Sequence, residues 1–382
     1  MTPAIMERAS DLREFVDSVA RLRDAVGVLS ITIGTEPGAV TGGASAWEIA
    51  VENDLAQLRR NRSVGSVLAR RSEEASTRLA ELLDATSAGR GRALYVALES
   101  GESSEVTLQS PLPTGARVGP VAHVLPLLAV LDEGEPAGLV GASRDALSVL
   151  ESELGVVRDV AHIELEPSIG DWWPEMKGPA RANPLRGQQT VSQRDRYARR
   201  LAAAYRHTLA EAPGATVALA RERSWTRAVL AGDPRTIDVL DEMLRAEGVA
   251  TTTIVANLEG LRTEDAVGRL ESALQTLVAR QQARLAEDVV SAANGVCGLV
   301  PVLAVLAQAR VDRLLIDTRR TFPGVVGPGE SLSAAGPGED PADLTDLIVG
   351  RALATDAAVT PLSGDAAGAL AASEGIAAVL RW

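Results

Sequence analysis

Helical and strand patterns alternate along most of the chain, and this alternation constrains the fold more than any other feature of the sequence. Apolar residues recur at three- and four-residue spacing over residues 11–26, which is typical of an amphipathic helix. The VLSITI run of residues 28–33 is rich in β-branched residues and predicts a strand. Helical and strand patterns of this kind follow one another as far as the closing IAAVLRW segment, which predicts a strand. The pattern therefore predicts a mixed α/β fold.

Two changes of pattern mark candidate domain borders. The GEPAG run of residues 134–138 precedes a predicted hairpin of residues 137–141 and 146–150, and a long helical pattern starts at Thr263. A length of 382 residues is enough for two or three domains of roughly 100–200 residues each. We predict three α/β domains, which cover residues 1–132, 133–262 and 263–382.

Local composition alone predicts the state of three further stretches. Prolines and glycines over residues 111–119 and over residues 320–341 predict loops. The short apolar VALA run of residues 217–220 predicts a strand.

The basic residues are almost all arginine, and this excludes several kinds of site. Lys177 is the only lysine and does not follow a glycine, so the chain has no GxxxxGK[ST] phosphate-binding loop and no lysine placed for Schiff-base or kinase chemistry. His123, His162 and His207 stand far apart, and Cys297 is the only cysteine. We therefore expect no metal site and no cofactor.

No apolar run reaches the roughly 18 residues that a membrane helix needs. The start of the chain also lacks the charged and apolar regions of a secretion signal. We expect a cytoplasmic protein without a membrane partner.

One segment is strongly basic although the chain carries a net charge of −13. Residues 181–207 contain seven arginines and a single acidic residue, Asp195. They run from an aperiodic loop of residues 168–190 into a predicted helix of residues 192–212. An acidic body with one basic element is typical of a protein that brings that element to phosphates. A solvated basic helix face is the alternative.

The same loop contains two adjacent tryptophans, Trp172 and Trp173. Exposed indole rings stack on RNA bases, whereas buried ones anchor a loop to its domain. Both interpretations remain open.

Four local patterns resemble those of one protein group. The LVPVLAVLAQARVDRLLID run of residues 299–317 is similar to a family pattern of a helix followed by "gRVdtLli", and residues 346–364 followed by GIAAVLRW (residues 375–382) resemble its closing "giaAlLRy". The SQRDRYARR run of residues 192–200 is similar to the start of the long central helix of that family. Over about residues 120–382 the chain resembles the bacterial relatives of archaeal and eukaryotic peptide-chain release factors, a group that includes Pelota-type rescue factors.

This resemblance implies a fold and a set of partners. The expected architecture has a variable, mixed-sheet α/β N-terminal domain, a ribonuclease-H-like middle domain, and an α/β/α C-terminal domain like those of kink-turn-binding ribosomal proteins. The expected partners are the ribosome, with its ribosomal RNA and transfer RNA, and a translational GTPase, but not DNA.

The resemblance also implies a candidate catalytic loop. Release factors carry a Gly-Gly-Gln loop whose glutamine helps water to attack the peptidyl-tRNA ester, and this chain has Arg186-Gly187-Gln188-Gln189 there, with one glycine missing. Strict alignment of the helix start moves the position towards Gln193. Gly187 and the glutamines Gln188, Gln189 and Gln193 are therefore all candidates. The predicted RNA-binding residues are Arg181, Arg186, Arg194, Arg196, Arg199 and Arg200.

Three functions from different classes remain open. The first is a ribosome-associated translation factor-like protein that binds near the A site in ribosome rescue or hibernation. The second is an active peptidyl-tRNA hydrolase on the same fold. The third is an α/β scaffold or small-molecule enzyme unrelated to RNA, against which the absence of a nucleotide loop and of a GxSxG motif counts.

Overall fold

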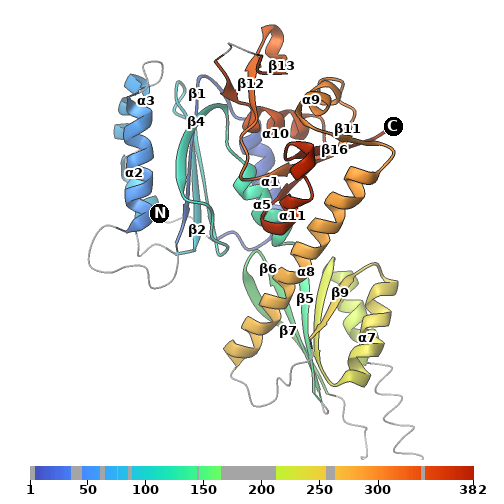
Figure 1. The fold of residues 1–382 in the computed structure, drawn as a ribbon. Helices are drawn as coiled ribbons and strands as arrows, with labels where there is room; N and C mark the ends of the chain where they lie inside the picture. Colours follow the sequence, from blue (N-terminus) through green and yellow to red (C-terminus); the bar gives the residue numbers. More distant parts are fainter. Residues whose placement is uncertain are drawn as a thin grey trace, which may run out of the picture. The chain divides into compact units, whose positions relative to one another are not determined.

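The computed structural model shows a mixed α/β protein with several sheets (Figure 1), as the sequence predicts. The structure describes residues 5–35, 45–60, 65–74, 76–84, 88–143, 146–164, 212–254, 263–336 and 340–382. Two compact units share the chain. The first consists of Met1–Glu135, Glu153–Val156 and Val278–Trp382, and the second of Pro136–Ser152 and Val157–Leu277. The three-domain borders near residues 132 and 262 stay a prediction.

The N-terminal sheet of the first unit is antiparallel, with the strand order β3-β2-β1-β4. Its strands are β1 (Arg23–Gly34), β2 (Gly91–Ala97), β3 (Ser103–Leu108) and β4 (Gly115–Val121). The short apolar runs of residues 92–98 and 104–108, on either side of the turn ESGES, predict a hairpin, and β2 and β3 confirm it. The loop predicted over residues 111–119 is wrong in its second half, because β4 pairs there with β1. Pro120 is tolerated because β4 lies at the edge of the sheet.

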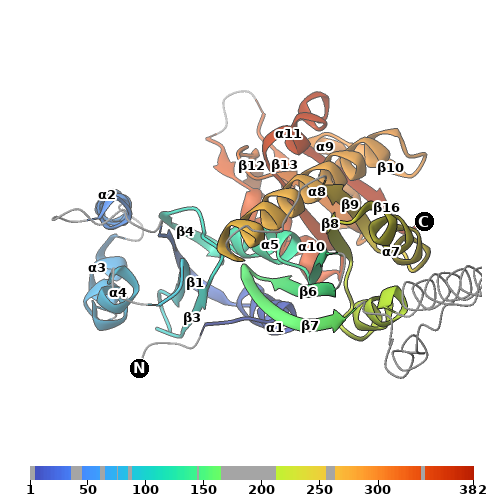
Figure 2. The ribbon, with the colours of Figure 1, turned by 90° about the horizontal axis from the view of Figure 1, so that it is seen from below.

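Helices cover both faces of this sheet. In β2, Leu94 and Val96 pack on one face against α2 (Ala46–Arg59), α3 (Gly65–Glu74) and α4 (Ser76–Leu83), which Figure 2 shows together beside the sheet. Ala93 and Tyr95 point to the other face and pack with α1 (Ala9–Ala20) and α5 (Leu125–Glu133). Side chains alternate across a strand, so every residue of β2 is buried.

The C-terminal sheet of the same unit has the order β10-β16-β11-β15. Its strands are β10 (Gly295–Cys297), β11 (Val311–Asp317), β15 (Ala358–Leu362) and β16 (Ile376–Leu380). Strand β11 runs parallel to β15 and antiparallel to β16. The apolar runs of residues 313–317, 357–360 and 376–382 predict the strands observed as β11, β15 and β16, whereas β10, with three residues, is not predicted.

This sheet also lies between two sets of helices. Leu314 and Ile316 join the buried cluster that holds α1 and α5, together with α9 (Leu299–Ala307) and α10 (Thr345–Ala354). Leu315 faces the opposite side and packs with α8 (Thr263–Ser291) and α11 (Gly364–Gly368). The arrangement is α/β/α, and one apolar cluster joins the N-terminal and C-terminal parts of the first unit.

The loop predicted over residues 320–341 contains regular structure. Strands β12 (Pro323–Val326), β13 (Leu332–Ala334) and β14 (Ala342–Asp343) form a small antiparallel sheet, with the short 3-10 helix η3 (Pro328–Glu330) inside it, and a second one, η4 (Ala371–Ser373), follows α11. The side chain of Phe322 is buried and fixes this sheet to the core of the unit. The prediction was wrong because strands of two to four residues are too short to show a period.

The second unit contains a five-stranded sheet in the order β7-β6-β5-β8-β9. Its strands are β5 (Ala137–Ala142), β6 (Ala146–Glu153), β7 (Val156–Glu164), β8 (Arg227–Gly232) and β9 (Ala250–Ile254). Strands β5 and β6 form the predicted hairpin, whereas β8 runs parallel to both β5 and β9. This mixed sheet is consistent with the ribonuclease-H-like middle domain that the resemblance implies.

Helices supply the rest of the apolar core of the second unit. Helix α7 (Pro234–Ala246) begins after Asp233, whose carboxylate accepts the backbone N–H of Thr236. Residues 212–222 are also helical, so the strand predicted over residues 217–220 is wrong. Val217 and Ala220 lie three residues apart, and both are buried in one cluster with the sheet. The three-residue spacing of buried side chains is that of a helix, and it outweighs the strand preference of the short apolar run.

Candidate functional site

The residues predicted to carry the chemistry lie outside the described part of the chain. They all fall between residues 165 and 211: Gly187, Gln188, Gln189, Gln193, Arg181, Arg186, Arg194, Arg196, Arg199, Arg200, Trp172 and Trp173. Their roles stay predictions. The described residues on either side of this segment show what holds its two ends.

The described residues on both sides of the segment belong to the second unit. They stop at Glu164 of strand β7 and resume at Ala212, in the helix of residues 212–222. Ala212 is buried in the apolar cluster of the unit, and its carbonyl accepts a hydrogen bond of 3.1 Å from the Thr216 hydroxyl. Apolar side chains of β7 pack against the same cluster, so the described residues before and after the segment share one core.

A buried ion pair fixes the turn that follows this helix. The guanidinium Nη1 of Arg223 lies 2.6 Å from Oε2 of Glu151, whose side chain is only 1% exposed. Close by, Trp225 packs on Gly138 of β5 so tightly that a Cβ at Gly138 would lie 2.2 Å from the indole ring. A buried carboxylate needs such a partner, so this junction has a structural role.

A second ion pair joins the same helix to α7 at the surface. Arg221 donates from Nε to Oε2 of Glu247 over 2.6 Å, and its Nη2 lies 2.5 Å from Oε1. This two-point hydrogen bond from Arg221 lowers the pKa of the Glu247 carboxyl, and the same bond raises the pKa of Arg221. Both side chains are in contact with water, so the pair contributes little to stability and mainly orients the helix of residues 212–222 against α7.

The first unit contains a cluster of four charged or titratable side chains that the sequence does not bring together. His123 Nδ1 lies 2.5 Å from Oδ1 of Asp346. Arg117 lies with Nη1 3.7 Å from Oδ2 of Asp346 and with Nη2 3.6 Å from Oδ2 of Asp343. An ionised carboxylate only accepts, so His123 donates from Nδ1. We call Arg117, His123, Asp343 and Asp346 the His–Asp cluster.

Backbone groups and neighbouring side chains hold this cluster in place. Asp343 accepts the backbone N–H groups of Phe322 at 3.2 Å and of Thr345 at 3.0 Å, which fixes the start of α10. The Tyr95 hydroxyl donates to the carbonyl of His123 over 3.2 Å. Burial raises the pKa of Tyr95 far above its usual range, and the charge of Asp346 adds to this. Tyr95 therefore stays a neutral donor.

A pocket of about 520 Å³ opens beside the His–Asp cluster. Arg117 and His123 line it, and the hydroxyls of Ser30 and Thr32 from β1 lie in its wall. Sequence reasoning missed the pocket because its residues come from distant parts of the chain. One signal was present: Ser30 and Thr32 occupy alternate positions in the apolar run VLSITI, so both point to the same face of the strand.

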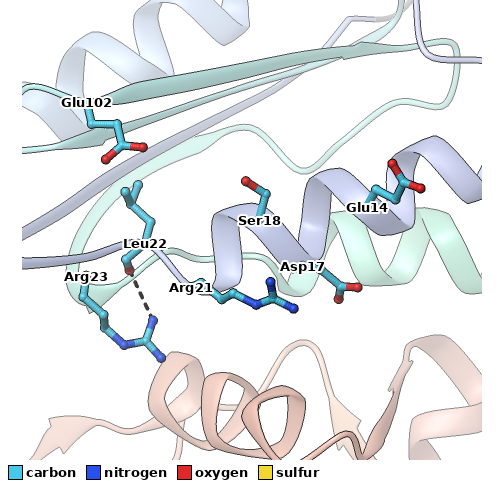
Figure 3. Close-up of a pocket in the computed structure, with 7 residues that line it drawn as sticks. All are labelled: Glu14, Asp17, Ser18, Arg21, Leu22, Arg23 and Glu102. Carbon is cyan, nitrogen blue, oxygen red and sulfur yellow. Dashed lines mark hydrogen bonds between the residues drawn. The ribbon is translucent and has the colours of Figure 1, made fainter.

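A second depression, at the end of α1, has a different character. Glu14, Asp17, Ser18, Arg21, Leu22, Arg23 and Glu102 line it. Figure 3 shows the carboxylates and guanidinium groups pointing in different directions rather than towards one point, and the one hydrogen bond drawn joins Arg23 Nη1 to the carbonyl of Leu22 over 3.2 Å. All these side chains except Leu22 are exposed. The depression offers no convergent set of groups for a ligand.

The described residues contain neither a candidate metal site nor a candidate membrane span. No group of three or more His, Cys, Asp or Glu side chains in the described part could hold a metal ion. None of the described helices combines the length and apolar composition of a membrane span. Cys297 lies half-buried in β10.

Comparisons with solved structures find distant matches. The chain is 17% identical to an archaeal translation termination factor aRF1, over 98% of each chain, with a TM-score of 0.26. It is 10% identical to a ribosome-bound archaeal Pelota in a model with ABCE1, over 99% of this chain and 95% of that one, with a TM-score of 0.40. Against Dom34 of S. cerevisiae the identity is 10%, the coverage 76% and 80%, and the TM-score 0.40. No curated protein matches.

A family model gives a more specific match. Residues 123–258 match the model described as "Bacterial archaeo-eukaryotic release factor family 10". The matched range contains the five strands of the second unit, the helix of residues 212–222 and the whole basic segment. The resemblance predicted from the sequence is therefore confirmed: over these residues the chain is similar to bacterial archaeo-eukaryotic release factor family 10.

Proposed function

We propose that this protein is a ribosome-associated translation factor that acts in ribosome rescue or hibernation by binding near the A site. The observation that carries the proposal is the family match over residues 123–258, which covers the basic segment together with the sheet and helix that flank it in the sequence. Seven arginines in residues 181–207 supply the charge that ribosomal RNA phosphates attract.

The described residues that follow this segment in the sequence are firmly packed. The helix that follows it is fixed by the Arg223–Glu151 pair and by the contact of Trp225 with Gly138. A loop that binds or reacts at a large RNA surface works best when its ends are held by such packing. The acidic remainder of the chain disfavours other contacts with RNA.

Cosedimentation with ribosomes over a salt series tests this function. We expect the wild-type protein to pellet with ribosomes at low salt, and the triple change Arg194→Glu, Arg199→Glu and Arg200→Glu to weaken this binding. Each lost phosphate contact reduces the slope of log K against log salt by about one. The matched control reverses Arg13, Arg21 and Arg70, three exposed arginines of the first unit. Binding that is equal for wild type and both triple variants at every salt concentration contradicts the proposal.

Peptidyl-tRNA hydrolysis is the second candidate function, and Gly187 next to Gln188 within the matched range favours it. A glutamine amide can orient the attacking water, and removing one positioned polar group from a reaction centre costs about 10²–10³ in rate. We expect Gln188→Ala, Gln189→Ala or Gln193→Ala to abolish peptide release at one position while ribosome binding stays intact. If the wild-type protein releases no peptide at saturating concentration, the hydrolase function is excluded and only the binding function remains.

Further parts of the proposal concern domains, partners and location. We assign the second unit to a ribonuclease-H-like middle domain and the C-terminal sheet to a domain like those of kink-turn-binding ribosomal proteins. A translational GTPase is the proposed protein partner, and the cytoplasm is the location that this function requires. Failure to bind ribosomes in any state would favour the third class, an α/β scaffold or small-molecule enzyme.

A further inference from the structure

We propose that the pocket beside the His–Asp cluster binds an uncharged, polyhydroxylated small molecule of about the size of a nucleoside. The proposal concerns the first unit alone and does not depend on the proposed function. We call this cavity the hydroxyl pocket. Its lining comes from β1, α2, the loop and strand around β4, α5 and the C-terminal part of the first unit.

Two buried hydroxyl groups give the pocket its first hydrogen-bonding capacity. Ser30 and Thr32 are only 2% and 5% exposed, and both are polar residues in the otherwise apolar run of residues 28–33. Ser30 Oγ accepts the backbone N–H of His123 over 2.9 Å, which leaves its own hydrogen for a ligand. Thr32 donates to the carbonyl of Pro113 over 2.6 Å, which leaves its oxygen as an acceptor. The pair therefore offers one donor and one acceptor side by side.

The charges around the pocket disfavour an anion. The two basic groups of the lining, Arg117 and His123, already face the carboxylates of Asp343 and Asp346. The lining also contains the carboxylate of Asp54. Together with Asp343 and Asp346 this makes three carboxylates beside two basic groups and leaves an acidic balance, so a phosphate or carboxylate ligand would meet like charge.

The Asp54 carboxylate is placed to accept hydrogen bonds from hydroxyl groups of a ligand. Asp54 Oδ2 accepts the backbone N–H of Ala116 over 2.9 Å, which fixes the carboxylate at the rim of the pocket. A carboxylate fixed in this way accepts hydrogen bonds from the vicinal hydroxyls of a sugar ring, as acidic residues do at ribose sites. The hydroxyls of Thr114, Thr318 and Ser363 add groups of the same kind.

Apolar side chains complete the wall and set the size of the ligand. Pro113, Pro126, Pro361 and Val130 present rigid apolar surface to the cavity. A pocket of about 520 Å³ falls in the range of roughly 300–1,000 Å³ that is typical of small-molecule sites. A molecule with one apolar ring and one polyhydroxylated ring, such as a nucleoside, matches both parts of the lining.

Ligand-detected NMR on the full chain tests the proposal, with adenosine as the neutral probe and adenosine 5′-monophosphate as its charged counterpart. We expect adenosine to bind and the monophosphate to bind at least about tenfold more weakly, because its phosphate meets the acidic balance of the pocket. Ser30→Ala and Asp54→Asn should each weaken adenosine binding by about three- to tenfold, the effect of one lost hydrogen bond. Arg21→Gln, in the depression at the end of α1, is the matched control and should leave binding unchanged.

Three results would overturn the proposal: no binding of adenosine to the folded wild type, equal or tighter binding of the monophosphate, or adenosine binding that neither Ser30→Ala nor Asp54→Asn alters. Ser30 also accepts a backbone N–H, so its replacement can disturb the fold. Asp54→Asn keeps an acceptor for Ala116 and therefore serves as the second variant, with circular dichroism as the check on folding.

Discussion

Two clusters of charged side chains in this molecule differ in how far they are removed from water. In the second unit, Glu151 is 1% exposed and meets Arg223 at 2.6 Å. In the first unit, the side chains of the His–Asp cluster are between 14% and 42% exposed, and their contacts range from 2.5 to 3.7 Å. The first arrangement has one short contact, and its carboxylate has almost no contact with solvent although Arg223 is 31% exposed. The second has several contacts and borders a pocket.

The comparison separates a charged pair that serves stability alone from charged groups that also border a pocket. A buried carboxylate has lost its water and depends on its partner, so Glu151 and Arg223 bind each other and are not free to bind a ligand. Arg117 and His123 keep part of their surface in the hydroxyl pocket, where they remain accessible to a bound molecule. Removing single partners from each cluster tests this difference.

The largest effect is expected for Glu151→Gln. This change leaves the Arg223 guanidinium without its buried carboxylate, and we expect the second unit to lose about 3 kcal/mol of unfolding free energy. This is the lower end of the usual range, since Arg223 is partly exposed. Urea unfolding measures the loss. Glu222→Gln, one residue before Arg223 and exposed, is the control, and a loss below about 1 kcal/mol for Glu151→Gln would show that the pair is not structural.

An intermediate effect is expected for Asp346→Asn in the His–Asp cluster. The change weakens the contacts of one carboxylate with His123 and Arg117, and we expect a loss of about 1–2 kcal/mol because the groups are partly hydrated. Hydrogen exchange should show faster opening of α10. Asp17→Asn, on the exposed face of α1, serves as the reference substitution. A loss as large as that of Glu151→Gln would remove the distinction between the clusters.

The smallest effect is expected at the exposed pair of Arg221 and Glu247. The pKa of Glu247 is lower in the folded protein than its ordinary value, so the pair stabilises the fold above that ordinary value and loses this contribution as pH falls through the lowered one. Arg221→Gln should therefore reduce the melting temperature slightly at pH 7 and not at all in strong acid. Arg235→Gln on α7 is the control, and a pH-independent difference would exclude the pair as its cause.

Much of the fold could be predicted from the sequence, because the spacing of apolar residues in a long segment indicates whether that segment is a helix or a strand. The helix of residues 263–291 and the hairpin of β5 and β6 are found where spacing and turn residues predict them. The errors fall on short segments. Strand β4 was predicted to be a loop because it contains Gly119 and Pro120. The run of residues 217–220 was predicted to be a strand, although tertiary packing places it in a helix.

The candidate site was predictable only in part. The family resemblance rests on local motifs, and the family match confirms it over residues 123–258. The hydroxyl pocket has no local motif, since Ser30, Arg117 and His123 lie far from Thr318 and Ser363 in the sequence. Only the pairing of β1 with β4 and the packing of α10 bring such residues together. A single sequence contains no direct signal for contacts of this range.

The position of β16 has a consequence for synthesis. Residues 376–380 are the last strand of the chain, yet they lie inside the C-terminal sheet, between β10 and β11. The second unit spans one nearly continuous stretch and is complete once Leu277 has left the ribosome. The first unit begins earlier and finishes later, because its apolar cluster needs Ile376 and Ala378 to close. The nascent chain thus exposes apolar surface of its N-terminal half until β16 has left the ribosome, and exposed apolar surface of this kind favours aggregation.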